Sequence, residues 1–308
     1  MTQETSPAPE LVLFETDAGC SKKELDRYIN SCQPVLIRGL NLDAKALKRW
    51  TPEYFHQMIK NEGDVISPRR HTPVGTENIS YKDITMAPQP ISEIVADCID
   101  PEDKAREIYV PGMRMTRLHY LEQDAPQSPL LQAINPDYGE LFMGRNTQCV
   151  GHFHPELQAL LCQMQGQKHV RLYPPSEFGK LQGFSIFSKH FSRCKINFYQ
   201  HNRQDFPNTR GMDVQRYPEA AKARYRDLVL NPGDALFIPV HWTHVTQGKD
   251  WNVSMAYFWK ARWREWGCNY PAIRTLARYP IKLVAFPFTL VGKIKGYRRM
   301  KRLSRQIS

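Results

Sequence analysis

The chain has 308 residues, and 42 Lys and Arg against 31 Asp and Glu give it a formal net charge of +11. Its length can bury a sizeable core, and 41% hydrophobic with 24% charged residues exclude an intrinsically disordered chain. The excess charge lies at one end, because residues 271–308 contain ten basic residues and no acidic one. The remaining 32 basic and 31 acidic residues nearly balance, so the charge does not indicate a nucleic-acid-binding surface over the whole protein.

Seven cysteines are dispersed along the chain, and no two form a CxxC pair. An odd, scattered set argues against a disulfide scaffold and suits a reducing compartment, so we expect a cytoplasmic protein. The N-terminal residues have neither a basic segment nor a long apolar run, which predicts no signal peptide. Residues 283–292 are apolar, but this run is too short to span a bilayer and Pro287 interrupts it.

The first half of the chain predicts short strands that alternate with helices, after a Pro- and Ser-rich, frayed N-terminus at residues 1–10. The expected elements are a strand and then a helix within 11–32, a buried strand at 34–39, a helix at 44–61, strands and loops at 64–85, and helical pieces at 113–122 and 129–134.

The centre of the chain changes character, because Gly and Pro break it into short apolar runs. The expected strands lie at 141–144, 151–163, 168–173, 227–239 and 252–259, and the expected helical pieces at 176–181 and 218–227. Such strands predict a small antiparallel barrel or sandwich, in a mainly β chain with flanking helices (α+β). We expect one domain over residues 11–262 and a helical, basic extension over 263–308.

The motif GHFHPE at residues 151–156 contains candidate metal ligands. Side chains at positions i, i+2 and i+4 of a strand share one face. His152, His154 and Glu156 would therefore converge, as far as the extended conformation persists past Pro155. Two imidazoles and a carboxylate are ligand types for Fe(II), Mn(II) or Zn(II).

A second motif, NPGDALFIPVHWTHV, occupies residues 231–245. Residues 232–234 predict a tight turn and residues 235–238 a strand that ends at Pro239. His244 lies just beyond, where a strand of the opposite sheet edge could complete a three-ligand face with open positions for a co-substrate and O₂.

An isolated HxH is more often packed or superficial than metal-bound, but the two motifs together, about ninety residues apart, are far more specific. His241 is the weaker member of its pair, and we interpret it as a residue behind the site or on the surface. The remaining histidines show no metal-ligand spacing; they are His56, His71, His119, His169, His190 and His201.

Lys168 is a candidate anion-binding residue. Residues 165–167 predict a hairpin turn, which places Lys168, Val170 and Leu172 on one face of the next strand. A Lys between apolar neighbours on the inner face of a barrel is costly unless an anion such as a dicarboxylate pairs with it. The alternative is a Lys at the strand end whose ammonium reaches solvent.

These motifs resemble those of the JmjC/cupin-like 2-oxoglutarate oxygenases, the family that includes the asparaginyl hydroxylase called factor inhibiting HIF. The resemblance extends over about residues 34–259 and rests mainly on GHFHPELQALLCQMQGQKHVRLYPP and LVLNPGDALFIPVHWTHV. PVLIRGL, WTPEY and LFMG support it.

The resemblance implies a double-stranded β-helix (a jelly-roll or cupin core) with Fe(II) and 2-oxoglutarate as cofactors and O₂ as co-substrate. It implies His244 as the distal metal ligand and Lys168 as the residue that pairs with 2-oxoglutarate. It also suggests that Asn252 and Ser254 line the cofactor pocket. The substrate would be a protein side chain or a small molecule.

This sequence departs from the family's HxD/E pattern. His152-x-His154 puts a histidine where the family has a carboxylate, whereas His154-x-Glu156 keeps the carboxylate but shortens the spacing to Lys168. Two other functions therefore stay open. One is a three-His cupin enzyme that does not use 2-oxoglutarate, and the other is a non-catalytic cupin-like binding module.

The basic extension has separate interpretations. Packing on the barrel or homodimerisation, with a solvated basic end, is preferred, because C-terminal helices do this in the family. Residues 281–305 mix apolar with basic side chains, which fits contact with an anionic membrane and a peripheral membrane location. Nucleic-acid binding is the least favoured, because the aromatic residues are not interleaved with the basic ones.

Overall fold

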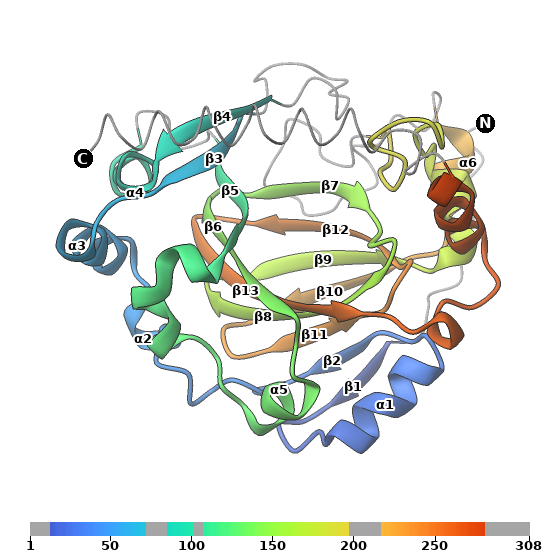
Figure 1. The fold of residues 1–308 in the computed structure, drawn as a ribbon, viewed down its shortest axis with the longest axis horizontal. Helices are drawn as coiled ribbons and strands as arrows, with labels where there is room; N and C mark the ends of the chain where they lie inside the picture. Colours follow the sequence, from blue (N-terminus) through green and yellow to red (C-terminus); the bar gives the residue numbers. More distant parts are fainter. Residues whose placement is uncertain (1–12, 72–84, 102–106, 197–216, 281–308) are drawn as a thin grey trace, which may run out of the picture.

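The computed structural model describes residues 13–71, 85–101, 107–196 and 217–280, and shows two sheets with flanking helices (Figure 1). The strands are β1 Phe14–Thr16, β2 Val35–Ile37, β3 Ile66–His71, β4 Thr85–Pro90, β5 Ile108–Arg114, β6 Tyr138–Arg145, β7 Gln148–His152, β8 Leu157–Gln165, β9 Lys168–Tyr173, β10 Arg226–Leu230, β11 Ala235–Ile238, β12 Thr243–Gly248 and β13 Trp251–Lys260.

The helices cover the larger sheet and the ends of the barrel (Figure 1). They are α1 Lys22–Asn30, α2 Ala46–Arg49, α3 Pro52–Glu62, α4 Ile91–Ile99, α5 Pro129–Ile134 and α6 Pro218–Ala221, with 3-10 helices η2 Met115–Asp124, η3 Pro175–Leu181 and η5 Trp263–Glu265. A further helical segment occupies residues 270–280. The predicted frayed N-terminus and the expected interfacial helix at 281–305 lie outside the described residues.

The strands form a nine-stranded sheet in the order β1-β2-β11-β8-β13-β6-β5-β3-β4 and a four-stranded sheet in the order β10-β9-β12-β7. Among the described residues, β1 and β2 form a parallel pair and the other strand pairs are antiparallel. Leu236 of the larger sheet and Val170 of the smaller one share a buried apolar cluster. The two sheets therefore face each other, in agreement with the predicted β-helix core.

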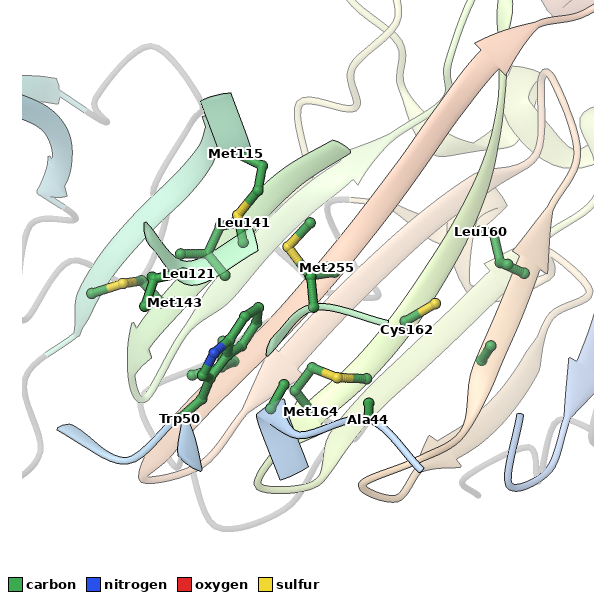
Figure 2. Close-up of a cluster of buried hydrophobic side chains, with 14 of the residues drawn as sticks. Ala44, Trp50, Met115, Leu121, Leu141, Met143, Leu160, Cys162, Met164 and Met255 are labelled. Atoms are coloured by element: carbon green, nitrogen blue, oxygen red, sulfur yellow. The ribbon is translucent and has the colours of Figure 1, made fainter. Parts of the chain in front are cut away.

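Strand alternation divides the apolar residues between two cores. On β11, Leu236 and Ile238 face the smaller sheet, whereas Ala235 and Phe237 join the core under the flanking helices. Figure 2 shows part of this second core, where Trp50 lies among sulfur-containing and aliphatic side chains such as Met255. A central sheet buried on both faces explains why its strands read as continuous apolar runs.

The hairpin between β8 and β9 fixes the position of Lys168. Gly166 has φ +66°, and a Cβ at this position would lie 2.5 Å from the backbone oxygen of Trp251. The two-residue turn makes Lys168 the first residue of β9, and Lys168, Val170 and Leu172 are all buried on one face. The predicted turn and the predicted shared face are therefore both present.

The turn before β11 is held by Asp234. One carboxylate oxygen accepts a hydrogen bond from the Gly39 amide at 3.0 Å, and the other accepts bonds from the Asn231 amide at 3.0 Å and the Arg38 guanidinium at 2.6 Å. These bonds join the turn to the segment after β2 and fix the start of the strand that leads toward His244.

Some elements differ from their prediction. The helix expected at 44–61 is divided, because Thr51 caps α3 and Pro52 occupies its first turn. The helix expected at 218–227 ends at Ala221, since Arg226 already pairs with Leu172. Helix α4 was not predicted.

In the described part of the chain, no helix is long and apolar enough to cross a membrane.

Candidate metal centre

Three histidines meet at one end of the smaller sheet. His152 is the last residue of β7, and His154 lies two residues later in the chain. His244 lies on β12, directly opposite His152 in the antiparallel pair. One ligand nitrogen from each ring can be chosen so that all lie within 4.8 Å of one another. The structure thus brings together three of the four predicted metal ligands.

Hydrogen bonds fix two of the three rings. Nδ1 of His152 lies 2.9 Å from the Val150 carbonyl oxygen, and Nδ1 of His244 lies 3.3 Å from that of Trp242. A carbonyl oxygen only accepts, so each Nδ1 donates its proton, and Nε2 is the nitrogen of each ring that could bind a metal. Such bonds orient metal-binding imidazoles and raise their basicity.

The ring of His154 has an unmet requirement. Its Nδ1 is buried and has no hydrogen-bond partner within the described structure. A buried polar atom without a partner costs roughly 1–3 kcal/mol. A coordinated cation would remove this cost, and three imidazoles suit a divalent ion of the Fe, Mn or Zn type. The residues therefore fit the metal that the sequence predicted.

Burial keeps two of the three rings, His154 and His244, uncharged. Burial lowers the pKa of His154 well below its usual range, and the nearby His244 and His152 lower it further. Burial also lowers the pKa of His244, with His152 as the next cause. The neutral form of these imidazoles, which is the form that binds metals, therefore dominates near neutral pH.

Glu156, the fourth predicted ligand, is not in this group. The strand ends at His152, and the chain bends at Pro155 and Glu156 before it enters β8 in the other sheet. The backbone oxygen of Glu156 accepts a hydrogen bond from Ala261, just after β13. The i+4 rule does not hold across this bend, and the role of Glu156 as a ligand stays a prediction.

The three histidine rings and Lys168 line a cavity between the two sheets. Its other walls include the apolar side chains of Leu161, Ile238 and Phe258 and the polar ones of Tyr109, Cys149 and Thr246. Sequence reasoning missed the polar wall residues, although Thr246 lies two positions after His244 and so on the same strand face.

Lys168 is 3% exposed and forms no ion pair within the described residues. Burial lowers its pKa to about 8, against a smaller opposite effect of Cys149. A buried cation without a counter-charge is unfavourable, so this end of the cavity suits an anionic group.

Asn252 and Ser254 on β13 do not line this cavity. The Ser254 hydroxyl donates to Oε1 of Gln163 at 2.6 Å, and the Asn252 amide donates to the Gln167 carbonyl at 2.8 Å. They therefore hold the hairpin that positions Lys168. Their assignment to cofactor binding stays a prediction.

His241 lies behind the cluster and is fully buried. Its Nε2 is 3.0 Å from the Pro155 carbonyl oxygen, and its backbone amide donates a hydrogen bond to the His154 carbonyl oxygen at 3.2 Å. Its ring lies edge-on to Trp266, which follows β13. The sequence left His241 either behind the site or on the surface. The structure places it behind the site, where it supports the bend that contains His154.

Comparisons with known proteins cover most of the chain. A family model described as a cupin-like domain matches residues 21–265. Lysine-specific demethylase 8 of Xenopus tropicalis is 26% identical over 254 residues, which cover 76% of this chain and 49% of that protein. tRNA wybutosine-synthesizing protein 5 of Danio rerio is 32% identical over 101 residues, which cover 33% of this chain and 26% of that protein. The chain thus spans about half or less of the length of these curated relatives.

Proposed function

The chain belongs to the cupin-like domain family, and from this premise we propose that it is an Fe(II)- and 2-oxoglutarate-dependent oxygenase. The proposed reaction hydroxylates a C–H bond of a protein side chain or a small molecule, with succinate and CO₂ as co-products. The membership confirms the resemblance seen in the sequence, and the demethylase relatives support the oxygenase class. The relatives' names refer to lysine demethylation and to wybutosine synthesis in tRNA, and the proposal does not choose among such substrates.

One observation supports the proposal best: the three clustered imidazoles and the buried Lys168 line the same cavity. A metal site alone would fit many enzymes. A metal site and an isolated cation in one small apolar cavity fit a co-substrate that chelates through one end and has a carboxylate at the other, as 2-oxoglutarate does.

His152, His154 and His244 would hold the ion, and their bonds to backbone carbonyls keep two of the rings in place before it binds. Iron, when bound, supplies O₂ activation coupled to the oxidative decarboxylation of 2-oxoglutarate. The Lys168 ammonium would bind the distal carboxylate and set the orientation of the co-substrate.

The apolar walls have a separate task. Leu161, Ile238 and Phe258 come from three strands of the larger sheet and face the histidines across the cavity. Their side chains exclude water from the space beside the metal ligands, which strengthens the attraction between Lys168 and a carboxylate.

Calorimetry with Mn(II)-loaded protein tests the proposal without knowledge of the substrate. We expect 2-oxoglutarate to bind, and Lys168→Met to weaken binding by about 10- to 100-fold, because a buried charged hydrogen bond is worth roughly 1.5–3 kcal/mol. Lys60→Met, at an exposed position of α3, is the matched control. With Fe(II) and O₂, the wild-type protein should release succinate. Absence of both 2-oxoglutarate binding and succinate would refute the proposal.

A second candidate function has its own observation: the cluster contains three histidines and no carboxylate. This donor set fits a cupin metalloenzyme that does not use 2-oxoglutarate. Such an enzyme would bind the metal through the same residues, whereas Lys168→Met would leave its activity intact. Metal binding that is lost in His244→Ala, together with no affinity for 2-oxoglutarate, would favour this candidate.

A further inference from the structure

The helix at residues 270–280 has its basic side chains on the inner side. Arg274 is 9% exposed, and its guanidinium donates to the backbone oxygens of Phe184 and Phe191, the latter at 2.9 Å. Arg278 donates to the Ile186 oxygen at 2.8 Å. These bonds attach the helix to the segment after η3, and in Figure 1 it is the dark red helix near α6.

The outer side of the same helix is uncharged. Tyr270, Ile273 and Leu276 are 48%, 56% and 44% exposed, and their spacing of three residues places them along one side. The other exposed residues of the segment are Ala277, Tyr279 and Pro280. A surface helix ordinarily presents charged and polar residues to water and buries its apolar stripe. Here this arrangement is reversed, which indicates that something other than water contacts the helix.

Two further aromatic side chains, Trp263 and Tyr279, extend this surface. Trp263 is 66% exposed and stacks on Trp266, and its ring centroid is 6.4 Å from that of Tyr279. Tyr279 is 36% exposed and continues the three-residue spacing of Tyr270, Ile273 and Leu276. We define the apolar face as Trp263, Tyr270, Ile273, Leu276 and Tyr279. These residues are half of the ten exposed large hydrophobic side chains in the described structure.

The sequence after the helix indicates what covers the apolar face. Residues 281–308 contain eight basic residues and no acidic one. In the sequence, this basic stretch follows the exposed Trp, Tyr and aliphatic side chains, and such a combination complements a surface that is negatively charged and apolar beneath, as an anionic lipid bilayer is. Trp and Tyr also prefer the depth of the lipid headgroups.

We propose that the apolar face docks on an anionic membrane surface. The side chains of the face enter the headgroup region, and the basic residues that follow the helix attract the acidic lipids. The interaction is peripheral and independent of the reaction proposed for the cavity, because the apolar face shares no residue with the cavity walls.

Co-sedimentation of the full chain with vesicles tests this proposal. We expect binding to phosphatidylcholine vesicles that contain phosphatidylserine, weak binding to pure phosphatidylcholine, and a loss of binding as salt rises. Ile273→Glu should lower the partition coefficient by about tenfold or more, because it replaces a large aliphatic side chain of the face with a carboxylate that acidic lipids repel. Ile99→Glu is the matched control, since Ile99 is 43% exposed at the end of α4.

Three results would overturn the proposal. One is equal binding to both kinds of vesicle, and another is unchanged binding of Ile273→Glu. The third is a lipid-free dimer that Ile273→Glu converts to a monomer, since a second copy would then cover the face. Circular dichroism of both variants verifies that each retains the wild-type fold.

Discussion

His244 stands directly across from His152 on the neighbouring strand, with 4.3 Å between the centroids of their rings. Two ligands of the candidate centre therefore come from one antiparallel pair of strands, whose hydrogen bonds set their separation. The third, His154, comes from the bend that leads out of the same sheet. The centre thus depends on strand register for two rings and on a connection for one.

Removal of His244 should abolish metal binding. His244→Ala leaves two imidazoles, and we expect Mn(II) or Fe(II) affinity to fall by more than about 100-fold, because even supporting residues contribute roughly 10–100-fold. Calorimetric titration with Mn(II) measures the effect. His56→Ala, at an exposed position of α3, should bind the ion as the wild type does. Similar affinities for all three proteins would place the metal elsewhere.

Glu156→Gln separates the two ligand sets that the sequence left open. The carboxylate lies outside the histidine group, so the substitution should change Mn(II) affinity by less than about twofold, which is the small effect expected of a substitution away from the binding site. His154→Gln, by contrast, should weaken it strongly. If Glu156→Gln were the more damaging change, the bend at Pro155 would have to rearrange on binding and bring the carboxylate to the ion.

The sequence allowed prediction where local chemistry decides the structure. The hairpin before Lys168 follows from Gly166 and strand alternation, both of which are local. The ligands on the strands could be predicted for the same reason. Glu156 was placed by the i+4 rule, which requires an extended chain, and the bend into the other sheet depends on tertiary pairing that no local pattern encodes. The resemblance suggested that Asn252 lines the cofactor pocket, whereas in the structure its side chain is buried and donates to a backbone oxygen of the hairpin.

The spacing of apolar residues also identifies which side chains share a face of a helix or strand, but it does not identify the element that packs against that face. The missed helix α4 has Ile91, Ile94, Val95 and Cys98 buried at helical spacing, a pattern that was present in the sequence. Short length and the preceding Pro90 obscured it. The outward apolar side of residues 270–280 could not be predicted, because apolar spacing alone is read as core.

Affinity for 2-oxoglutarate should fall as pH rises through about 8. Burial lowers the pKa of Lys168 to about 8, so the ammonium is present below that pH and is lost above it. Binding of a carboxylate needs the charged form, and each further pH unit should weaken binding by up to about tenfold. Calorimetry in two buffers of different ionisation enthalpy should show proton uptake above this pH. Lys168→Met should have weak affinity that does not vary with pH in this range.

His241 should stabilise the fold and position His154. His241→Ala removes the contacts to Pro155 and Trp266 and should lower the free energy of unfolding by about 1–3 kcal/mol. It should also weaken Mn(II) binding by about tenfold, as loss of a supporting residue does. Urea denaturation and metal titration measure the two effects. A loss of stability with wild-type metal affinity would assign a purely structural role.

Gly166→Ala tests how far the cavity depends on the hairpin. A methyl group at Gly166 would lie 2.5 Å from the Trp251 oxygen, and φ of +66° is unfavourable for alanine. We expect a loss of about 1–3 kcal/mol in the free energy of unfolding, together with weaker 2-oxoglutarate binding, because Lys168 begins the strand two residues later. Gly179→Ala is the matched control, since no atom lies within 4 Å of the added Cβ and its φ is unstrained. Urea denaturation of both variants should therefore separate them clearly. If they were equally stable, the turn would tolerate a side chain, and the position of Lys168 would have to depend on Asn252 and Gln163 instead.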